Sequence, residues 1–313
     1  MPWFGAEIDA PMVATRAVQF AASAVTAGLL IFRATVLTPG LRSSKLAGVI
    51  DARIRWSAWG ALLVTVASGA VWFVLQAASM SGLPLREAVT SDTLSAVLNE
   101  TQFGLVAQLR AICAVVLAVG LFGARSTSMR RLSLAAALGL VGAIAWTGHA
   151  GATTGEAGVW HLAADVLHLW AAAAWIGGLV GLMLVLLALR GDRSPLPMRT
   201  DLVRRFSMLG ILSVATLIGS GAVNSWILVG SVDGLLHTVY GRLLVIKLVI
   251  FAAMLAFAAV NRIWLTPRLA SSRAGRAAFA LACSTGIELA LGLVIFGIVG
   301  VLGTQHPAIH FLL

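Results

Sequence analysis

The sequence predicts an all-α integral membrane protein with eight membrane-spanning helices, and its composition and hydropathy pattern support this prediction. The chain has 313 residues, is 59% hydrophobic and 11% charged, and has a mean hydropathy of +0.96. Soluble domains of this length are much less apolar. Apolar runs of about 20 residues, long enough to cross about 30 Å of hydrocarbon, recur along the chain. We expect spans at 12–37, 56–80, 102–124, 132–150, 160–189, 207–230, 242–265 and 278–302.

Charge alternates between successive loops, and this alternation predicts the orientation of the helices. The loops after the odd-numbered spans are basic, and the loops after the even-numbered spans are mainly acidic. By the positive-inside rule, the basic loops face the cytoplasm and both termini face the periplasmic side. The net charge of +10 therefore reflects membrane topology, and we expect no nucleic-acid partner. The loops contain no nucleotide-binding pattern and are too short for a catalytic domain, so we expect neither ATP-driven transport nor enzymatic activity.

Two sequence patterns occur in the same order in both halves of the chain. The pattern T-x-[F/Y]-G-x5-[R/K] begins at Thr101 and again at Thr238, and it ends in Arg110 and Lys247. The tetrapeptide SGAV begins at Ser68 and again at Ser220. An even-numbered unit preserves topology, so we expect two parallel four-helix repeats, at 1–150 and 151–313.

The first helices of the two predicted repeats align on Gly28 and Gly177. This alignment places Met12, Arg16 and Gln19 opposite His161, Asp165 and His168. The second half would then carry ligand-type side chains at positions where the first half does not. Sites are expected where two such halves meet.

The strongest local signal is a cluster of ionisable residues at the outer end of span 160–189. His161, Asp165 and His168 fall on one helix face, with the two histidines about 10 Å apart along the axis. That spacing favours a ladder of sites, or a single histidine ligand that Asp165 orients. His149 ends the preceding span, and the link 150–159 can fold it back over this face. Ionisable groups inside a membrane usually have a function, here with a metal, a haem or a proton.

The remaining histidines lie on the same predicted side of the membrane. His237 immediately precedes the second copy of the T-x-[F/Y]-G pattern, and His306 and His310 follow the last span. We count all three as further metal-ligand candidates, with an exposed tail as the alternative for His306 and His310. For His161 and His168 the alternative is a hydrogen-bonded pair that stabilises helix packing.

An ensemble of motifs resembles the CopD (copper resistance D) family of bacterial inner-membrane proteins. The segments that carry the resemblance are 148–150, 168–179, 238–247, Asn261-Arg262 and the span that contains Glu288. The resemblance implies eight spans, a place in the bacterial inner membrane, copper as Cu(I) or Cu(II), and movement of copper across the membrane. It also implies a separate periplasmic copper-binding partner of the CopC type.

Three functions remain open from the sequence. The first is a copper importer that accepts the ion at His149, His161 and His168 and passes it inward past Asp165. The second is a receptor or assembly partner for a periplasmic copper chaperone, without transport. The third is a haem-binding membrane cytochrome with histidines as axial ligands. The outward position of the histidines shows where an ion is captured, and it leaves export open as well as import.

Overall fold

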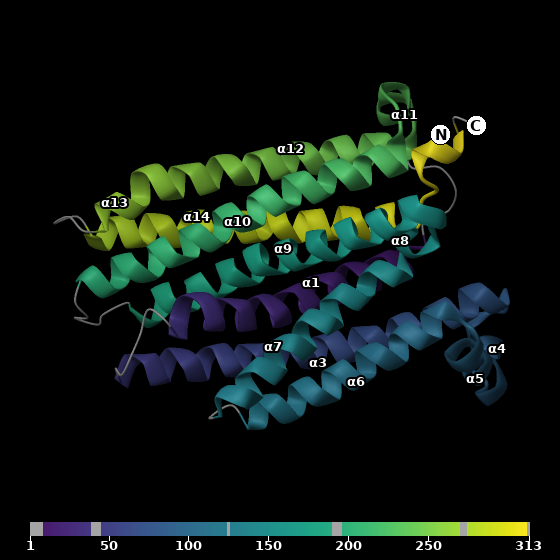
Figure 1. The fold of residues 1–313 in the computed structure, drawn as a ribbon, viewed down its shortest axis with the longest axis horizontal. Coiled ribbons are helices and arrows are strands. Elements are labelled where there is room, and N and C mark those ends of the chain that lie inside the picture. The colour runs from purple at the N-terminus through teal and green to yellow at the C-terminus, as the bar shows by residue number, and fades with distance from the viewer. Residues whose placement is uncertain (1–8, 39–44, 124–125, 190–195, 270–273, 312–313) are drawn as a thin grey trace.

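The computed structural model describes residues 9–38, 45–123, 126–189, 196–269 and 274–311. Among these residues no strand occurs, and eight helices are long and apolar enough to cross a membrane, which confirms the predicted fold class (Figure 1). These segments are α1 (Ala10–Phe32) with the π-helix η1 (Arg33–Leu37), α3 (Lys45–Ser81), α6 (Gln102–Phe122), α7 (Thr127–Gly142) with the 3-10 helix η2 (Ala143–Thr147), α9 (Gly155–Ala188), α10 (Leu196–Val229), α12 (Val239–Val260) with the π-helix η3 (Asn261–Leu265) and α13 (Thr266–Arg268), and α14 (Ala274–Leu302).

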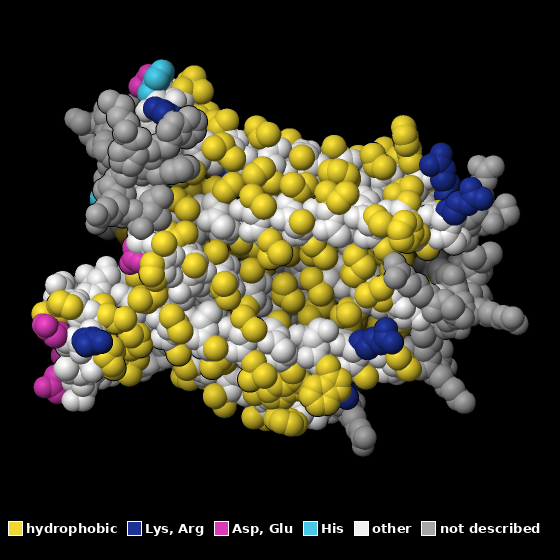
Figure 2. Space-filling view, turned by 180° about the vertical axis from the view of Figure 1, so that it is seen from behind, with side chains coloured by type: hydrophobic (Ala, Val, Ile, Leu, Met, Phe, Trp, Pro, Cys, Tyr) yellow, Lys and Arg dark blue, Asp and Glu magenta, His cyan; other side chains and the backbone are white. Residues whose placement is uncertain are grey.

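Short helices gather at one end of the bundle, where α1 begins and α14 ends (Figure 1). They are α4 (Leu85–Ala88), α5 (Ser91–Glu100), α8 (His149–Ala152), α11 (Val232–His237) and the 3-10 helix η4 (Ala308–Phe311). Figure 2 shows acidic and histidine side chains at this end, a broad apolar band in the middle, and most of the visible lysines and arginines at the opposite end. This distribution agrees with the predicted topology, in which the end with the short helices faces outward. We call it the outer end.

Helices α1 and α9 form the centre of the bundle and cross at two glycines. A Cβ atom on Gly28 would lie 2.6 Å from the Cα of Gly177 and only 1.9 Å from the carbonyl oxygen of Ala173. Small residues allow two helix backbones to approach this closely in a membrane. Gly28 and Gly177 are also the pair that the sequence alignment places opposite each other. Contact between equivalent residues is what a two-fold relation between the halves requires.

Two further contacts connect equivalent positions in the two halves. In the first half, Ser68 Oγ on α3 donates a hydrogen bond to Gln19 Oε1 on α1. In the second half, His168 Nδ1 on α9 lies 3.0 Å from Ser220 Oγ on α10. In the predicted repeat, Gln19 corresponds to His168 and Ser68 to Ser220.

The repeated T-x-[F/Y]-G pattern forms the same local structure in both halves. Thr101 Oγ1 accepts a hydrogen bond from Gly104 N at 2.9 Å, and Thr238 Oγ1 accepts one from Gly241 N at 2.9 Å. Each threonine therefore caps the N-terminus of a spanning helix, α6 or α12. Each cap also joins the spanning helix to a short surface helix, α5 or α11.

The two halves differ in what fills the space between their second and third helices. In the first half, Arg16 stacks over the ring of Trp72 at 5.2 Å, and Trp72 meets Phe103 edge-on at 5.3 Å. In the second half, Asn224 stands where the alignment places Trp72, and it donates a hydrogen bond to Asp165 at 3.1 Å. Helices α3 and α6 pack together, whereas α10 and α12 do not pack closely over the described residues. The second half consequently contains open space.

Candidate functional site

A cavity of about 480 Å³ lies in the outer half of the bundle, mainly among the helices that follow residue 150. Helices α9, α10, α12 and α14 surround it, and α1 and α8 also contribute to its wall. Its ionisable and strongly polar side chains are Arg16, His149, His161, Asp165, His168, Asn224, Tyr240 and Lys247. Its inner end is apolar and includes Trp175, Phe251 and Met254. The cavity therefore brings together the four principal candidates of the sequence analysis, His149, His161, Asp165 and His168. It does so at the interface of the two halves.

His161 is hydrogen-bonded to its neighbour Thr153. The ring is almost fully buried, with 1% of its surface exposed, and its Nδ1 lies 2.8 Å from Thr153 Oγ1. That hydroxyl also lies 2.9 Å from the carbonyl oxygen of His149, to which it can donate its one hydrogen. In that arrangement Nδ1 of His161 is the donor in the second bond. Nε2 of His161 then carries a lone pair that is available for a metal.

His168 has a similar contact deeper in the cavity. Ser220 Oγ lies 2.6 Å from the carbonyl oxygen of Thr216, and with its hydrogen on that carbonyl it accepts from Nδ1 of His168. Nε2 of His168 is then the nitrogen that can bind a metal. A hydrogen bond from the other ring nitrogen is the usual way in which proteins orient a metal-binding histidine. Asp165, which the sequence suggested as the orienting group, instead accepts a hydrogen bond from Asn224.

The charged residues of the cavity lie close to the deeper histidine. Lys247 interacts electrostatically with both Asp165 and His168. Arg16 borders the cavity from α1, where its guanidinium lies against Gly303 at the end of α14. A cation that enters the cavity therefore meets one carboxylate and two fixed positive charges. Such a site attracts a metal through the histidine lone pairs and not through net charge.

His149 lies at the outer mouth of the cavity, close to His161. Its Nε2 is 3.4 Å from the carbonyl oxygen of Leu302, and its ring meets that of Tyr240 edge-on at 6.0 Å. Helix α8 and Thr153 fold the ring back over α9, as the link 150–159 suggested. Over the described residues, no three histidine, cysteine or acidic side chains converge closely enough to hold one metal ion. The geometry favours the ladder of separate positions over a single closed site.

The other candidates lie outside this cavity. His237 is exposed on α11, and its Nδ1 pairs with Asp233 Oδ1 at 2.8 Å. His306 is exposed in the segment that follows α14. His310 belongs to η4, and its side chain lies outside the part that the structure describes.

Met254 is the cavity residue that the sequence did not single out. It is 1% exposed and lines the apolar inner end, where it contributes the thioether of the cavity lining. A single methionine in an apolar helix gives no local signal, so only the packing of α12 against α14 reveals its position.

Known proteins match this chain along most of its length. The family described as copper resistance protein D-like, N-terminal domain, matches residues 7–159, and the family described as copper resistance protein D matches residues 200–302. Copper resistance protein D of Pseudomonas syringae pv. tomato is 32% identical over 265 residues, which cover 79% of this chain and 80% of that protein. The chain belongs to the copper resistance protein D (CopD) family.

Two further relatives agree with this CopD assignment. Inner membrane protein YebZ of Escherichia coli K12 is 29% identical over 246 residues, or 76% of this chain and 82% of that protein. Copper transport protein CutJ of Bacillus subtilis 168 is 35% identical over 123 residues, or 39% of this chain and 22% of that protein. No solved structure matches the chain. Family and helices together make it a multi-pass inner-membrane protein with a copper-related function.

The CopD family matches leave a gap that contains the centre of the cavity. Residues 160–199 fall between the two matched regions. This interval includes His161, Asp165 and His168, so the family assignment does not by itself fix which residues meet copper.

Proposed function

We propose that this CopD-family chain carries copper across the inner membrane from the periplasm towards the cytoplasm, as a transporter and not as an enzyme. The observation that carries the proposal is the pair His161 and His168. Both rings have Nδ1 engaged by a hydroxyl, and both belong to one cavity in the outer half of the bundle. A periplasmic copper-binding protein of the CopC type would deliver the ion at the outer end, where α8, α11 and η4 lie.

The arrangement suits an ion that enters and leaves in steps. His149 and His161 stand at the mouth, and His168 lies about 10 Å further inward than His161 along α9. Imidazole is a good ligand for both copper oxidation states, and the thioether of Met254 suits Cu(I). A ladder of partly coordinated positions binds less tightly than a closed four-ligand site. Modest affinity favours transport, because the ion must leave as readily as it enters.

Lys247 provides a substitute cation while the cavity is empty. Its ammonium group lies near Asp165 and His168, where it partly balances the buried carboxylate. When copper reaches His168, its charge takes over that balancing role and repels the ammonium group. The lysine thereby lowers the copper affinity at His168, so that the ion can leave this position.

Copper uptake into proteoliposomes tests the proposal directly. We expect the triple substitution of His149, His161 and His168 by alanine to reduce uptake at least about tenfold, since each ring nitrogen lost removes a ligand. The matched control replaces His237 and His306, which are exposed and outside the cavity, and should transport at the wild-type rate. Unchanged uptake in the triple variant would overturn the role of the cavity. Release from loaded vesicles of known protein orientation distinguishes import from export.

A further inference from the structure

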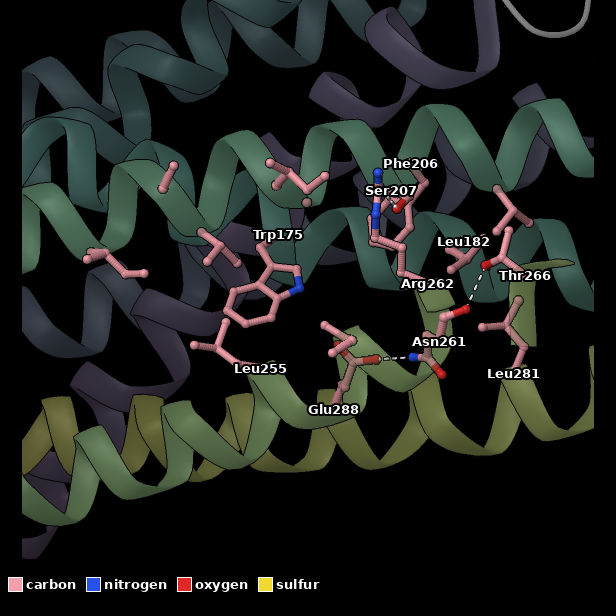
Figure 3. Close-up of a pocket in the computed structure, with 18 residues that line it drawn as sticks. Trp175, Leu182, Phe206, Ser207, Leu255, Asn261, Arg262, Thr266, Leu281 and Glu288 are labelled. Carbon is pink, nitrogen blue, oxygen red and sulfur yellow. Dashed lines mark hydrogen bonds between the residues drawn. The ribbon is translucent and has the colours of Figure 1, made fainter. Parts of the chain in front are cut away.

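A second cavity, of about 380 Å³, lies further from the outer end than the first (Figure 3). Helices α9, α10, α14 and the segment from α12 to α13 line it. Trp175 and Ile218 border both cavities, so the two cavities meet at these side chains. Most of the lining is apolar. Its polar side chains are Ser207, Asn261, Arg262, Thr266 and Glu288.

Glu288 is a carboxylic acid in the interior of a spanning helix, and it is only 1% exposed. Asn261 Nδ2 donates a hydrogen bond to Glu288 Oε1 at 2.5 Å, and Figure 3 shows the two side chains end to end. The other polar atom of the amide, Asn261 Oδ1, is buried and has no hydrogen-bond partner within the described residues. A buried acceptor without a donor is unusual, because it has lost its water and gained nothing in return.

Figure 3 shows Asn261 Oδ1 on the side of the amide that points away from Glu288, so the contact from Nδ2 to Oε1 joins the two groups. A protonated Glu288 keeps this contact, because its carbonyl oxygen still accepts from the amide N–H. An ionised carboxylate would leave a bare charge buried in the interior of a spanning helix. The buried carboxyl group therefore marks a place for a proton.

The other charged residue of this cavity is directed away from Glu288. Arg262 Nη1 donates to Ser207 Oγ on α10 at 2.5 Å, which links α10 to η3. Figure 3 shows its side chain extending towards α10, on the opposite side from Glu288. No further ionisable side chain borders the cavity among the described residues, so α9, α10 and α14 add no counter-charge to Glu288.

Asn261 lies where the backbone changes from α-helix to π-helix. Asn261 begins the π-helix η3, and Thr266 Oγ1 donates to its carbonyl oxygen at 2.7 Å. Short π-helical turns inside α-helices shift side chains out of the regular register and are frequent at functional sites. The lining of this cavity offers oxygen and amide groups but no histidine, methionine or cysteine within the described residues. Copper prefers the softer ligands of the outer cavity, so the chemistry here suits a proton.

We propose that Glu288 and Asn261 form an intramembrane proton-binding site on the inner side of Trp175. The coupling part of this proposal rests on the proposed copper transport. As a copper ion passes Trp175 inward, the O–H bond of Glu288 breaks and its proton leaves through the outer cavity to water on the periplasmic side. The carboxylate left behind balances the incoming positive charge, and it takes a proton from water on the cytoplasmic side once the ion has left in that direction. For Cu(I) the exchange of one proton for one ion leaves net charge unchanged.

Infrared spectroscopy of the purified protein tests the proton site without any copper. We expect the C=O stretch of a protonated carboxyl group at neutral pH, lost in Glu288→Gln and kept in Glu100→Gln, whose side chain is exposed on α5. Asn261→Leu should shift this band, because it removes both hydrogen-bonding atoms. A wild-type spectrum without the band at neutral pH would show that Glu288 is ionised and would overturn the proposal.

Proteoliposomes with a pH gradient test the coupling. We expect an opposing proton gradient to accelerate wild-type copper uptake several-fold and to leave Glu288→Gln unaffected, although that variant still transports copper down its gradient. Gradient-insensitive uptake by the wild type would overturn the coupling. An absence of copper movement in the wild type would overturn the transport function, while the infrared band would still decide the proton site.

Discussion

Two histidines in the outer cavity have Nδ1 bonded to a hydroxyl whose oxygen also bonds a backbone carbonyl. With the hydroxyl hydrogens on those carbonyls, Thr153 and Ser220 accept from the rings. Each ring then presents Nε2 as the metal-binding atom before any metal arrives. Preorganised ligands of this kind bind without first changing tautomer.

Replacing Ser220 tests this tautomer control. Ser220→Ala removes the acceptor for His168 Nδ1, so the ring is free to take the other tautomer. We expect the copper affinity of the purified protein to fall about tenfold, in line with losses of hydrogen-bond partners behind metal ligands. Ser68→Ala is the matched control, because this serine holds the corresponding Gln19 in the first half. An equal loss in both variants, measured by competition with a copper chelator, would contradict the idea.

Lys247 should act against copper binding. Lys247→Met removes a positive charge that interacts with Asp165 and His168. We expect equilibrium copper affinity to rise about tenfold, which corresponds to about 1.4 kcal/mol, while turnover falls because release is slower. Lys247→Arg keeps the charge and should bind copper as the wild type does. Weaker binding by Lys247→Met in the same chelator titration would refute this role.

At the scale of elements, the crossing of α1 and α9 sets the geometry of the cavity. The crossing holds α9 against the first half, and α9 carries His161, Asp165 and His168. Backbone contact at Gly28 and Gly177 leaves no room for a side chain. A substitution here therefore moves an entire helix and not just one residue.

Gly28→Ala tests how strongly this crossing is packed. Its new Cβ would lie 1.9 Å from the Ala173 carbonyl oxygen, so the helices must separate. We expect a loss of about 1–3 kcal/mol of stability, the usual cost of overpacking, seen as a lower melting temperature in detergent. Gly60→Ala on α3 adds the same methyl group where no atom lies within 4 Å. Its melting temperature should stay unchanged or rise slightly, and equal effects at both sites would argue against a tight crossing.

The sequence was most informative about features that repeat along one helix. Apolar run lengths predicted all eight spans, and helical spacing placed His161, Asp165 and His168 on one face. It could not reveal that Ser220 and Thr153 orient the rings, because contacts between helices depend on how they rotate and cross. The short link 150–159 did separate His149, which enters the cavity, from His237 and His306, which lie outside it.

At the scale of the whole molecule, charge is distributed along the bundle axis. The face in Figure 2 has its acidic and histidine side chains at one end and most of its basic ones at the other. The membrane-facing band between them is apolar. The positive-inside rule therefore predicts that the cavity with the histidines lies on the periplasmic side.

Cysteine labelling tests this orientation. In a variant with Cys113 and Cys283 replaced by alanine, we expect Ser91→Cys to react with a membrane-impermeant maleimide in intact cells. Ser126→Cys, which is also exposed but precedes α7 at the opposite end, should react only after the membrane is permeabilised. The opposite pattern would invert the topology and place the histidine cavity on the cytoplasmic side.

The stack of Arg16, Trp72 and Phe103 fills in the first half the space that remains open in the second. The two halves should consequently tolerate different kinds of amino-acid replacement among related sequences. In the first, a replacement is tolerated when it keeps the volume and shape of the aromatic stack. In the second, a change that packs perfectly well can still be rejected because it alters a ligand or a proton site. Related sequences should therefore conserve side-chain volume at these positions in the first half, and conserve ligand and proton-binding groups in the second.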